Sequence, residues 1–217
     1  TASDTRGVVV TDGENQLLDV SANFDTLVLS GTALTGTALI NRLEIKLRRR
    51  GLESGPEVDL SLKSNSIQLP KGVNRALGDF LDLAHLDVTF FGQLPKAWVA
   101  SEIGDWRDGG GIAEVTRGRI KWGPLDMVAE GTVTLDSQMR PLMSGTGSFK
   151  GYAETISTYK MAGLITPLNA AALTIALNMR RRDATGRITI PITGQNGQLW
   201  VGPWAGAQIK PLPLPTR

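Results

Sequence analysis

The chain has 217 residues, of which 41% are hydrophobic and 20% charged, and its formal net charge is only +2. This composition is typical of a folded protein rather than a disordered one, and the near-neutral charge gives no broad basic face for nucleic acid. The absence of cysteine excludes disulfides, thiolate nucleophiles and zinc sites built on sulfur. No apolar run approaches the roughly 18 residues of a membrane-spanning helix.

Alternation of apolar and polar residues with a period of two predicts half-buried β-strands along much of the chain. Four runs show it, at residues 42–48, 58–63, 86–90 and 188–193. Pro191 lies within the last run and cannot donate a ladder hydrogen bond, so we expect that run to be an edge strand.

The clearest predicted hairpin lies in the middle of the chain. Strand-like runs at 112–121 and 127–135 are joined through a Trp-Gly-Pro sequence at 122–124, where glycine and proline favour a turn. A third strand at 145–150 follows the polar segment 136–141. The three strands together predict an antiparallel meander.

Helical patterns are fewer. Residues 73–84 carry an apolar stripe with a period near 3.6, and residues 152–162 carry a similar one that stops at a glycine. Thr166 and Pro167 then provide a cap and a first-turn proline for a helix that ends at about Met179. The second half of that last segment also alternates as a strand would.

We therefore expect an α+β fold, with a curved, mostly antiparallel β-sheet and two or three helices packed on one face. The expected organisation is one sheet-rich domain over residues 1–217. Segments 43–51 and 176–186 are weakly similar around three arginines, which leaves open two similar halves at about 1–104 and 105–217. The tail at 210–217 contains three prolines and is expected to be extended or frayed.

No catalytic, cofactor-binding or metal-binding residue is predicted. His85 is the only histidine, and no serine or aspartate motif accompanies it as a catalytic partner. Asp79, Asp82 and Asp87 do not match the spacing of a calcium loop. The segment 105–111 is rich in glycine, but strand-like residues follow it and the lysine of a phosphate loop is missing, so we interpret it as a chain reversal. A hydrolase built on a carboxylate pair is the least favoured alternative.

The tryptophans are the best candidates for a ligand or partner surface. An indole at a strand end can grip an apolar ligand or anchor at a membrane interface, and it can equally plug the end of a sheet core. The arginine triplets at 48–50 and 180–182 can meet lipid phosphates or lie solvated. The candidate surface comprises Trp98, Trp106, Trp122, Trp200 and Trp204.

A string of short motifs across residues 60–210 resembles a known bacterial family. The most specific are a Trp-Arg-Asp-Gly-Gly loop at 106–110, the Trp-Gly-Pro turn at 122–124 and a Gly-Thr-Val-Thr-Leu-Asp strand at 131–136. The string resembles the alphaproteobacterial envelope family called domain of unknown function twenty-one twenty-five. No catalytic residue carries over from that family.

The resemblance implies a cellular location and a similarity to a known kind of envelope protein. Such proteins look like exported proteins held at the inner membrane by a segment that would precede Thr1, with their bulk in the periplasm. Their strands are similar to those of AsmA-like envelope proteins, whose curved sheets are linked to lipid movement between membranes.

Two functions from different classes remain as hypotheses. The first is a non-catalytic cell-envelope protein that binds or shields a lipid or hydrophobic ligand in envelope assembly or lipid transport. The alternative is a structural or protein-interaction module of the periplasm with no small-molecule ligand. The expected partners are lipid or envelope proteins near the membrane, with no nucleic acid and no cofactor.

Overall fold

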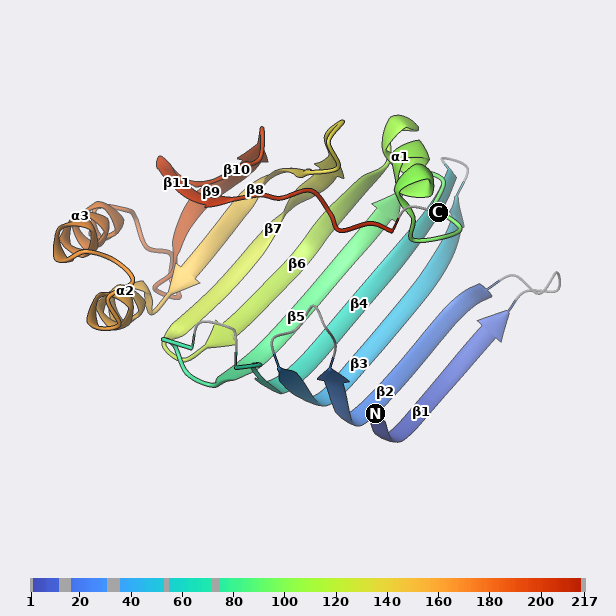
Figure 1. Ribbon diagram of the computed structural model, residues 1–217, viewed down its shortest axis with the longest axis horizontal. Coiled ribbons are helices and arrows are strands. Elements are labelled where there is room, and N and C mark those ends of the chain that lie inside the picture. The colour runs from blue at the N-terminus through green and yellow to red at the C-terminus, as the bar shows by residue number, and fades with distance from the viewer. Residues whose placement is uncertain (1, 12–16, 31–35, 53–54, 72–74, 216–217) are drawn as a thin grey trace.

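The chain forms one open, curved sheet of antiparallel strands in which every strand pairs with its neighbours in sequence (Figure 1). The computed structural model describes residues 2–11, 17–30, 36–52, 55–71 and 75–215. Within these ranges the strands are β1 Ala2–Thr11, β2 Leu17–Ser30, β3 Thr37–Leu52, β4 Gly55–Gln68, β5 Phe80–Phe91, β6 Ile112–Trp122, β7 Leu125–Leu135, β8 Pro141–Lys150, β9 Ile188–Gln195, β10 Gln198–Val201 and β11 Trp204–Gln208. The helices are α1 Ala100–Asp108, α2 Tyr152–Met161 and α3 Pro167–Asn178.

The strand register gathers the apolar residues on one face of the sheet. Directly opposed residues of an antiparallel pair point to the same face, so a row of partners can be followed from strand to strand. One such row crosses nine strands and consists of Val9, Val20, Leu47, Leu60, Val88, Val115, Gly131, Gly145 and Ile192. We call the face that carries this row the apolar face.

The opposite face carries polar side chains that pair across neighbouring strands. Arg48 of β3 lies 3.3 Å from Asp19 of β2. Asp126 of β7 accepts from Arg119 of β6 at 3.0 Å and also pairs with Arg187, which precedes β9. The first two ion pairs join neighbouring strands, and the Arg187 pair reaches across β8 from the start of β9 to β7. This polar face therefore needs no further cover and can meet solvent.

All three helices pack on the apolar face. Helix α1 lies at one end of the strands, and α2 and α3 lie at the other (Figure 1). Ile103 of α1 lies over the ends of β5 and β6 and is almost fully buried. Helices α2 and α3 enclose the main buried cluster with β9, formed by Tyr152, Ile156, Ala170, Leu177, Ile188 and Ile190. The predicted fold class, a curved antiparallel sheet with helices on one face, is confirmed.

The last two predicted helices and the central hairpin are also confirmed. Helix α3 begins at Pro167, and the Thr166 hydroxyl caps it by accepting a hydrogen bond from the Asn169 N–H at 3.2 Å. The segment that also fitted a strand is therefore helical. Trp122 and Leu125 are the closing pair of the β6–β7 hairpin.

The helix predicted for residues 73–84 is wrong. Val73 lies outside the described residues, Leu77 is in a turn, and Phe80 already begins β5 opposite Gln68 of β4. Gly78 has φ of +120°, which a right-handed helix does not allow. The stripe that suggested a helix belongs partly to this turn and partly to the strand.

The prediction that Pro191 marks an edge strand is also wrong, because β9 lies between β8 and β10. The last β9–β10 partners are Ile192 and Val201, so β10 has ended at the level of Pro191. The Pro191 carbonyl points to that side and accepts from the Gly202 N–H at 2.7 Å. The missing N–H of the proline therefore falls where no ladder partner is needed.

The lowered pKa of the Asp126 carboxyl predicts how the free energy of unfolding depends on pH. Burial raises the pKa of its carboxyl, but the hydrogen bond from Arg119 and the charge of Arg187 outweigh burial, so the pKa lies below the ordinary aspartate value. The stabilisation is therefore complete above the pKa of the unfolded chain, about 4, and is lost as the pH falls through the lower folded pKa. We expect Asp126→Asn to lower the free energy of unfolding at pH 7 by about 1–3 kcal/mol and to flatten its acid dependence.

Urea denaturation as a function of pH measures both effects. Asp108→Asn is the matched control, because Asp108 also pairs with an arginine but is exposed, where solvent screens the pair. Equal acid dependence in Asp126→Asn and the unaltered chain would contradict this account.

Candidate functional site

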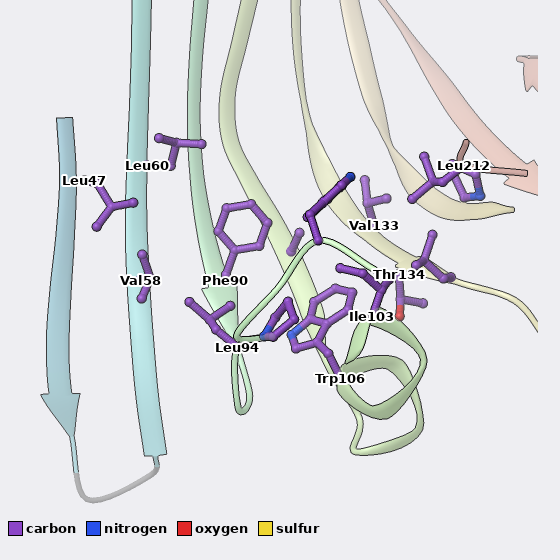
Figure 2. Close-up of a pocket in the computed structure, with 15 residues that line it drawn as sticks. Leu47, Val58, Leu60, Phe90, Leu94, Ile103, Trp106, Val133, Thr134 and Leu212 are labelled. Carbon is purple, nitrogen blue, oxygen red and sulfur yellow. The ribbon is translucent and has the colours of Figure 1, made fainter. Parts of the chain in front are cut away.

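The apolar face holds a cavity of about 390 Å³ beneath α1 (Figure 2). Its floor is the sheet itself, with Leu47 of β3, Leu60 of β4, Phe90 of β5 and Val133 of β7 pointing into it. These residues lie on one face because the alternation of each strand is kept in register with its neighbours. The floor is thus a direct product of the pattern seen in the sequence.

The roof is built from the loop that follows β5 and from α1. Leu94 of the loop and Ile103 and Trp106 of α1 face the floor (Figure 2). The Trp106 indole N–H donates to the Phe91 carbonyl at 2.9 Å, which fixes the ring at the end of β5. The ring lies against Gly111, where any Cβ would overlap it. A glycine at 111 is therefore required for the roof to close on the sheet.

The C-terminal tail forms the third wall. After β11 it runs in extended form along the end of the sheet toward α1 (Figure 1). The Leu212 N–H donates to the Met139 carbonyl at 3.0 Å, and the Ala100 N–H of α1 donates to the Pro215 carbonyl at 3.3 Å. Leu212 lines the cavity. The extended tail predicted from its prolines is confirmed over its described residues, and it is docked along its length.

The chemistry of the cavity is that of an apolar container. None of the described residues that line it is charged. Two of its polar groups already have partners within the protein, since the Thr134 hydroxyl donates to the Gly111 carbonyl at 2.8 Å and the Trp106 N–H is bonded to the Phe91 carbonyl. A ligand would therefore meet hydrocarbon and aromatic surface, which favours an apolar guest over a polar one.

The structure brings two of the five candidate tryptophans together. Trp98 and Trp106 both line the cavity, and Trp98 is 65% exposed at its rim. Their positions allow contact with the same guest.

The other three tryptophans lie elsewhere. Trp122, at the far end of β6, donates its indole N–H to the Gly78 carbonyl at 2.9 Å and so holds a turn. Trp200 stands opposite Thr193, on the polar face. Trp204 packs against the cluster under α2 and α3. The five do not form a single surface.

His85 lies within β5 on the polar face, away from the cavity. Its Nε2 is 2.8 Å from a carboxylate oxygen of Asp87, in an orientation too poor for a hydrogen bond. Burial raises the pKa of Asp87, but the hydrogen bond from Ser61 and the neighbouring His85 lower it to a value below the ordinary one. Ser61 donates to Asp87 at 2.6 Å and forms no hydrogen bond with the histidine. The three residues therefore lack the nucleophile–base contact of a serine hydrolase.

The glycine-rich segment 105–111, predicted to be a chain reversal, is helical in its first part and reverses the chain only in its second part. Asp105 to Asp108 form the last turn of α1, and the reversal begins at Gly109. The Gly109 N–H donates to the Asp105 carbonyl and the Gly111 N–H donates to the Trp106 carbonyl, and these two bonds end the helix.

Among the described residues no group of three or more potential metal ligands occurs. None of the described helices has the length and apolarity needed to cross a bilayer.

The fold and the cavity define a class of protein, namely a single-layer antiparallel sheet whose apolar face carries a cavity covered by one helix and a C-terminal tail. The chain belongs to the family described as uncharacterized protein conserved in bacteria, DUF2125, whose sequence profile matches residues 3–210. No curated protein and no solved structure matches the chain. The family resemblance seen in the motifs is thus confirmed, and the match extends further toward the N-terminus than those motifs do.

The sequence alone does not single out the apolar residues of the cavity floor. Leu47, Leu60 and Phe90 fall within runs that predict strands, but nothing local distinguishes a strand residue under a roof from one in a filled core. The sequence signal that points to the roof is the Trp-Arg-Asp-Gly-Gly motif at 106–110. Its tryptophan, Trp106, is in contact with Gly111, the residue directly after the motif.

Gly111→Ala tests the roof. The added methyl overlaps the Trp106 ring, so we expect the indole to move and the free energy of unfolding to fall by about 1–3 kcal/mol. Gly118→Ala is the matched control, since a methyl there has only ordinary contacts. Thermal and urea denaturation, with tryptophan fluorescence as the second signal, compare the two variants. Equal stability of both would show that Trp106 is not held as described.

Proposed function

We propose that this protein is a non-catalytic component of the cell envelope that binds or shields a lipid or another hydrophobic ligand, in envelope assembly or lipid transport. The observation that carries the proposal is the cavity of about 390 Å³ with its apolar lining. Burial of an alkyl chain there gains about 0.8 kcal/mol per methylene.

The apolar face continues beyond the cavity and supports a guest longer than the hollow itself. Val20, Ala22, Ile45 and Leu62 lie on this face in β2, β3 and β4, and each is only half-buried. No described helix lies over the middle of these three strands (Figure 1). An acyl chain that leaves the cavity beside Leu47 would therefore still find apolar surface along the sheet.

The envelope location is part of the proposal. Its support is the sequence resemblance to periplasmic proteins with AsmA-like strands, in which a curved sheet presents an apolar face. An open antiparallel sheet with one apolar face is consistent with that resemblance. A tether to the inner membrane belongs to the same hypothesis.

A second candidate function is a protein-interaction module, and the edge strand β1 favours it. Val8, Val9 and Val10 are 62%, 61% and 46% exposed, and they project on both faces at one edge of the sheet. Such an edge can add a strand from a partner. It needs no small-molecule ligand.

Native mass spectrometry separates the two candidates. The protein is purified from a bacterial host, its intact mass is measured, and solvent extracts are analysed for lipid. We expect a stoichiometric lipid or fatty-acid adduct. A mass without adduct that persists after incubation with envelope lipids would overturn the lipid proposal and favour the interaction module.

A substitution that fills the cavity gives a sharper test. Leu47→Trp places an indole over the floor, where it competes with the guest, so we expect the adduct to fall at least tenfold. Thr132→Trp is the control, because Thr132 is exposed on the polar face. Circular dichroism checks that both variants keep the sheet. An unchanged adduct in Leu47→Trp would place the guest elsewhere.

A further inference from the structure

Helix α3 is apolar on two opposite sides, although only one side packs against the protein. Its inner side presents Ala170, Leu173 and Leu177 to the cluster on β9. Ala170 and Leu177 are 5% and 8% exposed. This inner stripe and the hydrogen bond from the Tyr152 hydroxyl to Asn178 at 2.9 Å attach α3 to the protein.

The outer side of α3 carries a second apolar stripe. Leu168, Ala172, Ile175 and Met179 follow one another at intervals of four, three and four residues, which places them along one line of a helix with about 3.6 residues per turn. Leu168, Ile175 and Met179 are 79%, 64% and 82% exposed. In Figure 1, α3 lies outermost, beyond the end of the sheet. No described element covers the outer stripe.

Neighbouring apolar residues enlarge this surface. Met161 at the end of α2 is 75% exposed, and Leu164 in the α2–α3 loop is 47% exposed. An exposed helix with apolar residues on both sides is typical of contact with another apolar phase. At 12 residues, α3 is too short to span a bilayer, which needs about 20.

The charges around α3 are basic. The helix itself contains no charged residue. Arg180 and Arg181 come after the C-cap residue Met179 and are exposed, and neither side chain forms a hydrogen bond or ion pair with the described part of the chain. Lys160 is exposed at the end of α2, beside the groove between the two helices.

The nearest acidic groups do not cancel this charge. Asp183 accepts hydrogen bonds from the backbone N–H groups of Thr185 and Arg187 and so is turned toward its own loop. Glu154 lies in the first turn of α2. Arg182 is held by the Tyr152 hydroxyl at 2.8 Å and is part of the packing between α2 and α3.

We propose that the α2–α3 hairpin docks on the surface of an anionic lipid bilayer. The outer stripe of α3 enters the boundary between head groups and acyl chains, while Lys160, Arg180 and Arg181 lie near the lipid phosphates. The combination of an apolar helix face and adjacent basic residues is that of interfacial helices. This docking surface is separate from the cavity under α1 and does not depend on a ligand there.

Co-flotation with vesicles tests the proposal. The full chain is incubated with vesicles of equal parts phosphatidylglycerol and phosphatidylcholine, and separately with vesicles of phosphatidylcholine alone. We expect binding to the anionic vesicles that weakens as salt is raised. No flotation with the anionic vesicles would overturn the proposal and favour a protein partner for the stripe.

Two sets of variants locate the contact. Ile175→Ser removes one exposed apolar side chain and should weaken the partition coefficient about tenfold without loss of fold. Arg180→Gln and Arg181→Gln should each weaken it about fivefold. Arg117→Gln, an exposed arginine on β6, is the control and should bind as the unaltered chain does. Equal binding of all variants would overturn the assignment to α3.

A probe on the stripe gives an independent signal. The chain has no cysteine, so Met179→Cys can carry a single environment-sensitive fluorophore. We expect its emission to shift to the blue with anionic vesicles. The same label at Ser137→Cys, in the turn before β8, should not shift. A shift at 137 and none at 179 would mean that another face meets the membrane.

Discussion

The structure depends on one constraint: alternation with a period of two must stay in register across successive antiparallel strands. Because opposed residues share a face, a single row runs from Val9 of β1 to Ile192 of β9. A one-residue slip at any hairpin would send the following apolar side chains to the polar face. The cross-strand ion pairs on that face, such as Arg119 with Asp126, support the same register.

A single-layer sheet cannot cover its own apolar face, so other segments must do so. Helices α2 and α3 cover β8 and β9 with a compact cluster. Helix α1 and the tail bridge the other end and leave space beneath them. On β2, β3 and β4 the apolar side chains of Val20, Ile45 and Leu62 are half-buried, while Val9 of β1 is 61% exposed. The cavity and the open apolar surface thus have the same origin, which is incomplete cover of one face.

The sequence predicted what is local and missed what is assembled over distance. The strands at 42–48 and 58–63 could be predicted because their alternation repeats within a few residues, and α3 because Thr166 and Pro167 mark its start. Strand β1 was not predicted, since Val8–Val10 is continuous rather than alternating. The cavity joins Leu47, Trp106 and Leu212, and no local pattern connects residues so far apart. The edge-strand prediction from Pro191 was wrong because β10, the neighbouring strand on that side, ends before it reaches the proline, and its length cannot be read from the sequence around Pro191.

The strictly sequential order of strands also has a kinetic consequence. Most neighbouring strands are joined by short connections, although α1 lies between β5 and β6, and α2 and α3 lie between β8 and β9. The sheet can therefore grow largely by addition of one neighbouring strand at a time, in the manner of a repeat array. The tail makes a far more distant contact, since the hydrogen bond from the Ala100 N–H to the Pro215 carbonyl joins residues separated by more than half of the chain. Closure of a long loop costs more entropy than closure of a hairpin. The tail is therefore expected to be the last segment to dock during folding and the first to detach when the protein opens locally.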